Sequence, residues 1–259
     1  MGENTYPWKS VWITGASTGI GRQLALSLAA SGVKVAVSAR SAGKLAELAA
    51  GNPGVTAYPL DVTDRAAVAA AAAEINDAAG GIDLAIFNAG TWHPNAAVDL
   101  DGAKAAKSMA VNYLGVVYGI EAVLPHMRQR GLGHIAFTGS VAGYRGLPKS
   151  CHYGPTKAAL INLAETLSIE LNREGICVTI INPGFVDTPM TEVNDFPMPF
   201  LMTPEDAAGR ILEKLPRKPF EIAFPWPLVR QLKFTQMLPP ALYVRLIRRF
   251  LGSKAKPQR

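Results

Sequence analysis

The chain has 259 residues, of which 49% are hydrophobic and 18% charged, and its formal net charge is +6. A chain of this length and composition can bury a large core as one domain without disulfide staples. The positive charge is concentrated: residues 222–259 hold eight basic residues and no acid, which leaves 18 basic and 20 acidic residues elsewhere. This distribution argues against nucleic-acid binding, which needs a basic face on a recognisable binding module.

The first residues lack the basic stretch and apolar run of a signal peptide, and Tyr6 breaks the myristoylation pattern. No apolar run reaches the roughly 18 residues of a membrane-spanning helix. We therefore expect a cytoplasmic protein in which Cys151 and Cys177 are reduced thiols.

Short apolar runs alternate with longer helical stretches along the chain. The expected strands are 10–14, 34–39, 55–60, 84–89, 134–140 and 177–183. The expected helices are 19–31, 41–50, 64–79, 101–130 and 155–173. Strand–helix alternation of this kind predicts an α/β fold, a doubly wound parallel sheet with crossover helices.

A glycine-rich turn, "TGASTGIG" (14–21), follows the first expected strand and opens a helix. Gly15, Gly19 and Gly21 permit a tight turn, close backbone approach and close helix packing. The free N–H groups at the helix start would bind a pyrophosphate. The spacing is G-x3-G-x-G, and a glycine turn alone also suits an ordinary loop, but its position favours nucleotide binding.

The second expected strand ends in "VSAR", with Arg40 and no nearby acid. An acid there would hold the ribose 2′-hydroxyl of NAD, whereas an arginine accommodates the 2′-phosphate of NADP. The sequence therefore favours NADP(H) over NAD(H). Asp61, in "PLDVT", is placed to bind the adenine amino group, or else to cap the next helix in competition with Thr63.

Several motifs together resemble the classical short-chain dehydrogenase/reductase family over roughly residues 8–220. They are "TGASTGIG" (14–21), "NAG" (88–90), Asn112, Ser140, "YGPTK" (153–157) and "NPG" (182–184), in the family's order and approximate spacing. The resemblance implies a single Rossmann-type domain and an oxidoreductase that interconverts a carbonyl and an alcohol. It also implies a homodimer or homotetramer.

The resemblance implies four catalytic residues: Asn112, Ser140, Tyr153 and Lys157. Tyr153 would be the general acid in reduction and the base in oxidation, with its pKa lowered by Lys157 one helical turn away. Ser140 would hydrogen-bond the substrate oxygen. Asn112 would hold a water in a proton relay from Lys157.

The resemblance also implies a set of cofactor-binding residues. They are Gly15, Ser17, Thr18, Gly19, Ile20, Gly21, Arg40, Asp61, Val62, Asn88, Ala89, Gly90, Tyr153, Lys157, Pro183, Gly184, Val186 and Thr188. No metal site is expected, because the four histidines lack paired spacing and no Cys–His pattern supports zinc.

Gly154 and Pro155 separate the expected tyrosine and lysine, although both residues disfavour helix interiors. Proline is tolerated in the first turn of a helix, where its missing N–H would have no partner. We therefore expect a helix start near 151–153, with Tyr153 in the opening turn.

Residues 187–208 fall where the family has a mobile substrate lid, and we call them the lid segment. They contain Met190, Phe196, Met198, Phe200, Leu201 and Met202. These adaptable apolar side chains favour a hydrophobic small-molecule substrate; the alternative is that they only pack the lid onto the core.

The sequence divides into a main domain, 1–221, and a helical basic C-terminal extension, 222–259. The stretch 239–253 reads as an amphipathic helix with arginines largely on one side. Such a helix can lie on an anionic membrane, as a peripheral contact through 239–259, or cover the substrate pocket or a subunit interface. Two alternatives to a cytoplasmic reductase remain: a non-catalytic nucleotide sensor or scaffold, and a membrane-surface lipid ketoreductase.

Overall fold

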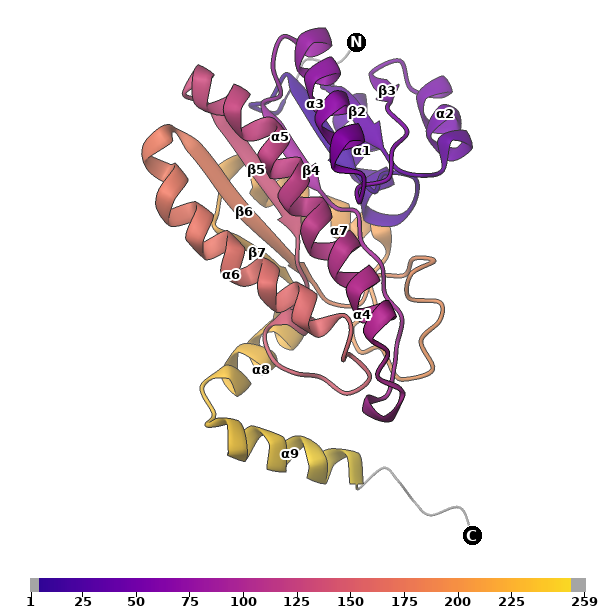
Figure 1. Ribbon diagram of the computed structural model, residues 1–259, viewed down its shortest axis with the longest axis vertical. Coiled ribbons are helices and arrows are strands. Elements are labelled where there is room, and N and C mark those ends of the chain that lie inside the picture. The colour runs from indigo at the N-terminus through magenta and orange to yellow at the C-terminus, as the bar shows by residue number, and fades with distance from the viewer. Residues whose placement is uncertain (1–4, 253–259) are drawn as a thin grey trace.

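The computed structural model describes residues 5–252, with side chains to residue 249. Its centre is one seven-stranded parallel sheet in the order β3-β2-β1-β4-β5-β6-β7 (Figure 1). The strands are β1 Ser10–Thr14, β2 Lys34–Ser38, β3 Val55–Ala57, β4 Leu84–Phe87, β5 Gly133–Thr138, β6 Ile176–Pro183 and β7 Glu221–Phe224. The strand order reverses between β1 and β4, which is where open α/β sheets bind ligands.

Helices cover both faces of the sheet, so the expected doubly wound architecture is confirmed. The helices are α1 Gly19–Ala30, α2 Ala42–Ala50, α3 Arg65–Ala79, α4 Gly102–Met109, α5 Gly115–Arg130, α6 Gly154–Leu171, α7 Pro204–Lys214, α8 Trp226–Gln236 and α9 Pro240–Gly252. On one face α1, α2 and α7 pack on the sheet, and on the other α3, α5 and α6 do so.

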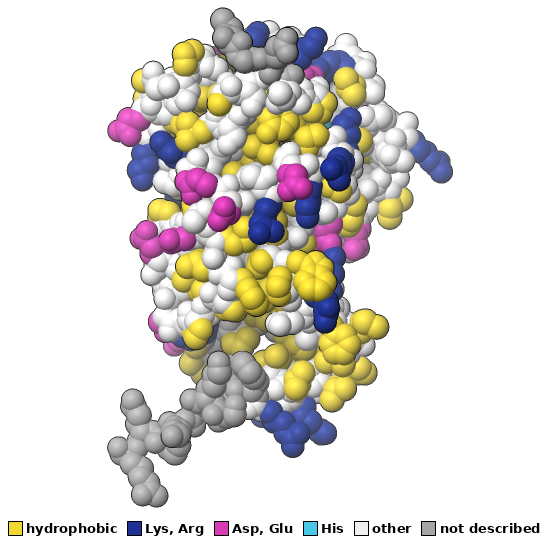
Figure 2. All heavy atoms as spheres, turned by 180° about the vertical axis from the view of Figure 1, so that it is seen from behind, with side chains coloured by type: hydrophobic (Ala, Val, Ile, Leu, Met, Phe, Trp, Pro, Cys, Tyr) yellow, Lys and Arg dark blue, Asp and Glu magenta, His cyan; other side chains and the backbone are white. Residues whose placement is uncertain are grey.

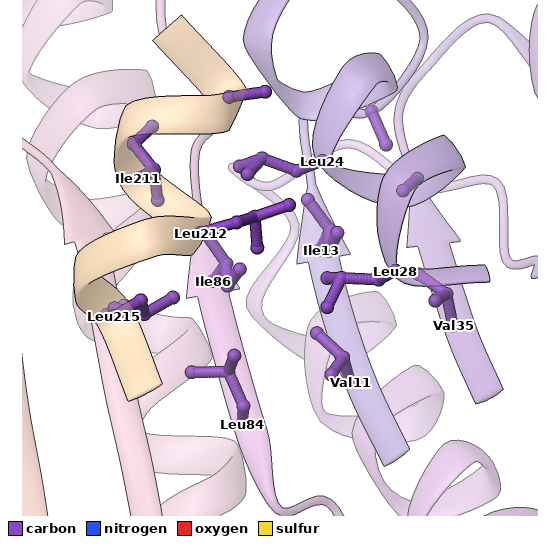
Figure 3. Packing of buried hydrophobic residues seen from close by; sticks show 14 of the residues in the cluster. Val11, Ile13, Leu24, Leu28, Val35, Leu84, Ile86, Ile211, Leu212 and Leu215 are labelled. Atoms are coloured by element: carbon purple, nitrogen blue, oxygen red, sulfur yellow. The ribbon is translucent and has the colours of Figure 1, made fainter. Parts of the chain in front are cut away.

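The hydrophobic core is built on strands that are apolar along their whole length. Such strands suit a parallel sheet, because helices bury both of its faces. Along β1, Val11 and Ile13 face one helical layer, and Trp12 between them faces the other. Figure 3 shows the first layer, in which leucines of α1 and residues of α7 converge on these strands. The residues drawn there include Val11, Ile13, Leu24, Leu28, Val35, Leu84, Ile86, Ile211, Leu212 and Leu215.

The helical run 102–130 is continuous through α4, a π-helical turn at Ala110–Leu114 and α5. By length and composition alone this run could cross a membrane, with a mean hydropathy of 1.2 in its most apolar window. Val116, Ile120 and Val123, however, are buried against the sheet in the second helical layer. The run is therefore a core helix of this fold.

Two elements lie outside the expected pattern. The short strand β7 pairs with β6 and continues the sheet across the expected boundary between residues 221 and 222. The helix α7 takes in the last residues of the lid segment, and Ala207 and Ala208 belong to the core. The expected strand 55–60 is regular only over Val55–Ala57, although the N–H groups of Tyr58 and Leu60 still donate to the carbonyls of Val37 and Ala39 at 2.8 and 3.1 Å.

The two C-terminal helices extend from β7 beyond the sheet, with α9 farthest from it (Figure 1). Arg145 holds the turn between them by donating to the carbonyl oxygen of Thr235 at 2.8 and 3.1 Å and to that of Leu238. Tyr243 of α9 is buried, and its hydroxyl donates to the carbonyl of Gly146 at 2.7 Å. Residues 254, 256 and 259, three of the basic residues of the expected extension, lie outside the described part.

Candidate functional site

A cleft of about 530 Å³ opens at the carboxyl ends of the strands, beside the point where the strand order reverses. Its volume lies within the range of small-molecule and cofactor sites. The glycine turn, the end of β2, the segments after β4 and β5, the start of α6 and the segment after β6 all line it. Sequence motifs far apart in the chain therefore meet in one cavity.

The glycine turn needs its glycines for steric reasons. Gly15 and Gly19 have φ of 70° and 57°, a left-handed region that favours glycine. A Cβ on Gly15 would lie 2.7 Å from the backbone of Ala89, and one on Gly19 would lie 2.8 Å from the Thr188 side chain. Gly21 packs against the carbonyl of Gly15, as expected for close helix packing, and does not line the cleft.

Because α1 begins at Gly19, its first N–H groups lack partners within the helix and carry the positive end of its dipole toward this turn. Thr18, the N-cap residue, makes no side-chain capping bond. Because its glycines carry no side chains, this turn lets a ligand approach the backbone and its N–H donors closely. The turn therefore fits a dinucleotide pyrophosphate.

Arg40 and Asp61 line the same end of the cleft. Asp61 accepts hydrogen bonds from the backbone N–H and the hydroxyl of Thr63, both at 2.9 Å. These bonds, with the nearby charges of Arg40 and Lys107, hold the pKa of Asp61 below its usual value. The N-cap of α3 is Asp64, so the alternative that Asp61 or Thr63 caps this helix is wrong.

Tyr153 is the N-cap residue of α6, which begins at Gly154 with Pro155 in its first turn. The expected helix start is thus confirmed within one residue. The N–H of Lys157 donates to the carbonyl of Tyr153 at 3.2 Å, which sets the two side chains one turn apart. A Cβ on Gly154 would lie 3.1 Å from the Ser150 hydroxyl oxygen, so this glycine makes room for a neighbouring segment.

Burial controls the charge of this pair. It raises the pKa of Tyr153 to about 12, against the opposing effect of a hydrogen bond from Ser140. It lowers the pKa of Lys157 to about 7. The Lys157 ammonium donates to the carbonyl of Thr138 at 2.7 Å and lies 5.4 Å from the centre of the Tyr153 ring.

This arrangement differs from the expectation that Lys157 lowers the tyrosine pKa. Desolvation disfavours both the phenolate and the ammonium, and it is the largest effect on each pKa. A lysine whose pKa is near 7 also carries only part of a positive charge at neutral pH. Tyr153 is therefore protonated near pH 7, as a proton donor must be.

Ser140 caps the short 3₁₀ turn Val141–Gly143 that follows β5. Its hydroxyl oxygen accepts from the N–H of Ala142 at 3.1 Å, which fixes the side chain at the cleft wall. The hydroxyl itself donates to the Pro183 carbonyl at 3.5 Å, a long hydrogen bond that a substrate oxygen in the cleft can replace. Ser140 is therefore oriented as a hydrogen-bond donor beside Tyr153.

Asn112 is fully buried in the π-helical turn and does not line the cleft. Its amide group donates to the Thr91 carbonyl at 3.0 Å and to the Thr156 hydroxyl at 3.1 Å, and its oxygen accepts from the Thr91 N–H at 2.7 Å. A π-turn displaces one residue from the regular helical ladder and often marks a functional site. Here Asn112 ties the segment after β4 to the start of α6.

The apolar side chains of the lid segment are divided between packing and solvent, since Phe200 and Leu201 are 49% and 45% exposed. Of its six apolar residues, only Met190 lines the cavity. Phe196 packs edge-on against Phe185 with ring centres 6.1 Å apart, and Met202 packs against the core. Lys149 and Asp195 form an ion pair at 2.6 Å that holds this segment to the loop before α6.

Trp92 was not among the expected site residues. Its ring meets that of Tyr153 edge-on, with centres 4.9 Å apart, and its indole N–H donates to the side-chain oxygen of Asn194 at 2.8 Å. The signal was its place two residues after the end of the "NAG" motif, where the chain passes the reaction site.

Apart from Gly21 and Asn112, every expected site residue lines the cleft. Further lining residues are Ala39, Ser41, Leu60, Thr91, His93, Lys107, Val111, Thr138, Gly139, Met190 and Thr191. Most of them directly adjoin expected residues in the sequence. Lys107 comes instead from α4, five residues before Asn112, and its spacing carried no signal.

Within residues 5–252, no cluster of His, Cys, Asp and Glu side chains is suitable for binding a metal ion. Both Cys151 and Cys177 are free thiols. His152 is buried and accepts from the N–H of Asp101 at 3.1 Å, so it fixes the loop before α4.

Comparison with known proteins agrees with this geometry. The sequence profile of the short chain dehydrogenase family matches residues 9–196. An "Uncharacterized oxidoreductase" of Myxococcus xanthus is 37% identical over 253 residues, which are 96% of this chain and 99% of that protein.

Two solved structures are also similar. A short-chain dehydrogenase/reductase from Burkholderia phymatum in complex with NAD has a TM-score of 0.81 and 25% identity, and the match covers 88% of this chain and 92% of that one. The structure of ElxO with NADP bound has a TM-score of 0.76 and 26% identity, with 83% and 96% covered.

The chain belongs to the short-chain dehydrogenase family. It is an oxidoreductase of that family, and its glycine cradle lies in the same fold as the two neighbours that hold NAD and NADP.

Proposed function

We propose that this protein is an NADP(H)-dependent oxidoreductase that interconverts a carbonyl compound and an alcohol. The observation that carries the proposal is the meeting of Ser140, Tyr153 and Lys157 in the cleft that the glycine turn also lines. These side chains come from two separate segments, and only the fold brings them together.

In reduction, the hydroxyl of Tyr153 donates its proton to the substrate oxygen. The raised pKa keeps this proton in place at neutral pH until the oxygen gains negative charge. The hydroxyl of Ser140 donates a hydrogen bond to the same oxygen and stabilises that charge. A nicotinamide cofactor held by the glycine turn of this cleft would supply the hydride to the carbonyl carbon, or would accept it in the reverse direction.

Lys157 has a pKa of about 7, so it can take up or release a proton near neutral pH. Through its bond to the Thr138 carbonyl it is held beside Tyr153. Asn112 holds the Thr91 backbone and the Thr156 hydroxyl, and Thr156 in turn donates to the carbonyl of Tyr153 at 2.7 Å. Asn112 is therefore a positioning residue for the start of α6.

The preference for NADP(H) rests on Arg40, which lines the cleft just after β2 where an NAD-binding protein would hold an acid. The only carboxylate lining this cleft within the described residues is Asp61, and Thr63 already engages one of its oxygens. The exposed guanidinium of Arg40 at this position supports the proposal that the protein accepts a 2′-phosphate.

The proposed substrate is a hydrophobic ketone, aldehyde or alcohol. Met190 and Val111 line the cleft, and the ring of Trp92 packs beside Tyr153. A homodimer or homotetramer, which the family resemblance implies, and a cytoplasmic location complete the proposal. Sedimentation equilibrium of the purified chain would measure the oligomer.

The deciding experiment is NADPH oxidation across a panel of hydrophobic and polar carbonyls, with Tyr153→Phe as the control. Loss of turnover in Tyr153→Phe, with NADPH binding retained, is the expected result. Activity that survives the substitution would refute the mechanism. Tight NADPH binding without turnover of any carbonyl would favour a nucleotide sensor instead.

A further inference from the structure

An apolar stripe runs along the exposed face of α8 and continues onto Met237, its C-cap residue. Trp226, Phe234 and Met237 are 65%, 63% and 80% exposed, although each is large and hydrophobic. Their spacing, eight and then three residues, places them on one side of the helix. The side of α8 that carries Leu228 and Leu232 is occupied, because both residues pack against the cluster of Val141, Tyr144 and Val229. The stripe is therefore a second apolar face with no covering element among the described residues.

Basic side chains accompany this stripe. The Arg230 guanidinium lies over the Trp226 ring, 4.9 Å from its centre. On α9, Arg245, Arg248 and Arg249 are three and four residues apart, so they share one side of the helix. They line a hollow of about 660 Å³ together with Pro240, Ala241 and Val244. Figure 2 shows hydrophobic and basic side chains gathered over the lower part of the molecule, where α8 and α9 lie.

Neither helix contains an acid that could pair with these arginines. Lys233 is already paired with Glu221 of β7. Three like charges at this spacing repel one another and destabilise the helix. An anionic partner would remove that repulsion, and the exposed aromatic and methionine side chains require a partner that is also apolar.

A second copy of the chain does not satisfy both requirements. A two-fold contact brings the same patch of each subunit together. Because neither helix contains an acid, Arg230 and the α9 arginines would meet no opposite charge in such a contact, and like-charge contacts are costly.

We propose that the exposed face of α8 and the basic face of α9 dock on an anionic lipid surface. Helices with Lys or Arg beside Trp, Phe and Leu lie in the interface of anionic membranes. Tryptophan in particular is enriched at the level of the headgroups. The arginines would contact lipid phosphates and carboxylates, while the α8 stripe enters the acyl boundary.

The surface is fixed relative to the reaction site. Arg145, which follows Ser140 in the same loop, holds the carbonyls of Thr235 and Leu238 at the end of α8. Tyr144, its neighbour, accepts a hydrogen bond from Gln236 at its carbonyl oxygen, at 3.2 Å. A protein docked through α8 and α9 would therefore present its cleft in one orientation to the lipid.

The test is co-sedimentation of the full chain with phosphatidylcholine vesicles that contain or lack phosphatidylserine. We expect binding to the anionic vesicles only, weakened by salt because exposed charges are screened. Arg245→Glu/Arg248→Glu/Arg249→Glu should weaken it by on the order of 100-fold, since each basic residue near an anionic surface adds to the affinity. The matched control reverses three exposed basic residues elsewhere: Arg173→Glu/Arg210→Glu/Lys214→Glu. This control variant should retain much more vesicle binding than the variant of the three α9 arginines.

The apolar contribution is tested with Trp226→Ser/Phe234→Ser/Met237→Ser, which should also reduce vesicle binding. In the wild type, tryptophan emission should shift to the blue with anionic vesicles, and Trp226→Phe should lose that shift. Circular dichroism and turnover of a soluble carbonyl show that each variant is folded.

Absence of binding to the anionic vesicles overturns the proposal, as does equal weakening by the control variant. Concentration-dependent self-association that the apolar variant abolishes, without vesicle binding, would assign the face to a second copy.

Discussion

Trp92 joins Tyr153 to the lid segment: its ring packs edge-on against the tyrosine ring while its N–H donates to Asn194. Asn194 is held further by a contact from its amide nitrogen to the Met198 sulfur at 3.2 Å. The orientation of the proposed proton donor and the position of the lid segment therefore depend on the same indole.

Trp92→Phe keeps an aromatic ring beside Tyr153 but removes the hydrogen bond to the lid segment. A hydrogen bond of this kind contributes about 0.5–1.5 kcal/mol, so we expect kcat/KM to fall by roughly 2- to 10-fold. Asn194→Ala should produce the same loss, and the double variant should lose no more than either single one. Trp92→Ala removes the ring as well and should cost more. Additive losses in the double variant would contradict the coupling.

Ser140→Ala removes the donor that faces the substrate oxygen and leaves Ala142 without its side-chain partner. By analogy with oxyanion donors, kcat should fall by about 10²–10³-fold, with little change in KM for the cofactor. Steady-state kinetics with saturating NADPH measures this. Thr at this position retains a hydroxyl, and Ser140→Thr should recover part of the lost rate.

The pH dependence of reduction should report Lys157. Its pKa is lowered to about 7 by burial, so its positive charge is lost as the pH rises through that value. We expect kcat for reduction to decline above about pH 7, while Tyr153, with a pKa of about 12, stays protonated. Lys157→Arg keeps its charge over this range and should lack the transition near 7. A wild-type profile that is flat from pH 6 to 9 would contradict the assignment.

Arg40→Asp should reverse the cofactor preference. The introduced carboxylate would repel the 2′-phosphate of NADPH and accept a hydrogen bond from the ribose of NADH. The ratio of kcat/KM for NADPH to that for NADH should therefore fall below one. Arg40→Ala separates the two effects, because it removes the attraction without adding repulsion. An unchanged ratio in both variants would exclude Arg40 from cofactor selection.

Buried His134 makes the fold sensitive to acid. Thr179 donates its hydroxyl hydrogen to the Pro219 carbonyl at 2.6 Å, so the histidine must donate its Nε2 hydrogen to the Thr179 oxygen, 2.9 Å away. Burial lowers the pKa of His134 to about 3 from its ordinary 6.5. The folded state therefore binds this proton less readily than the unfolded state does, and stability falls as the pH drops from 6.5 toward 3.

The slope from this single group reaches at most about 1.4 kcal/mol per pH unit. Urea unfolding at a series of pH values measures it. His134→Asn keeps a donor for Thr179 but cannot become charged, so its stability curve should be flatter below pH 6.5. Parallel curves for the two proteins would contradict this role.

The fold was largely predictable because each of its central strands is a continuous apolar run bounded by turn residues. β7 was missed, since its four residues lie among prolines and β7 owes its place to pairing with β6. α7 could have been found: Thr203 caps it, Pro204 stands at its first position, and Glu205 and Asp206 occupy its first turn.

The residues of the candidate site also differ in how well the sequence predicts them. Residues held by a local motif, such as the glycine turn and the start of α6, were placed correctly from sequence. The environment of Tyr153 was not, because desolvation depends on what the whole chain buries around it. The partners of Asn112 and Trp92 were equally hidden, since they lie in segments distant in sequence.

Arg145 lies five residues after Ser140, in a segment with the reaction site at one end and the C-terminal helices at the other. Coupling between two sites is reciprocal by thermodynamic necessity. A substrate that shifts this segment on binding must change, by the same factor, the affinity of whatever occupies α8 and α9. Substrate binding in the cleft and surface binding by α8 and α9 would then be coupled. Arg145→Met should remove this coupling, so that each binding event becomes independent of the other.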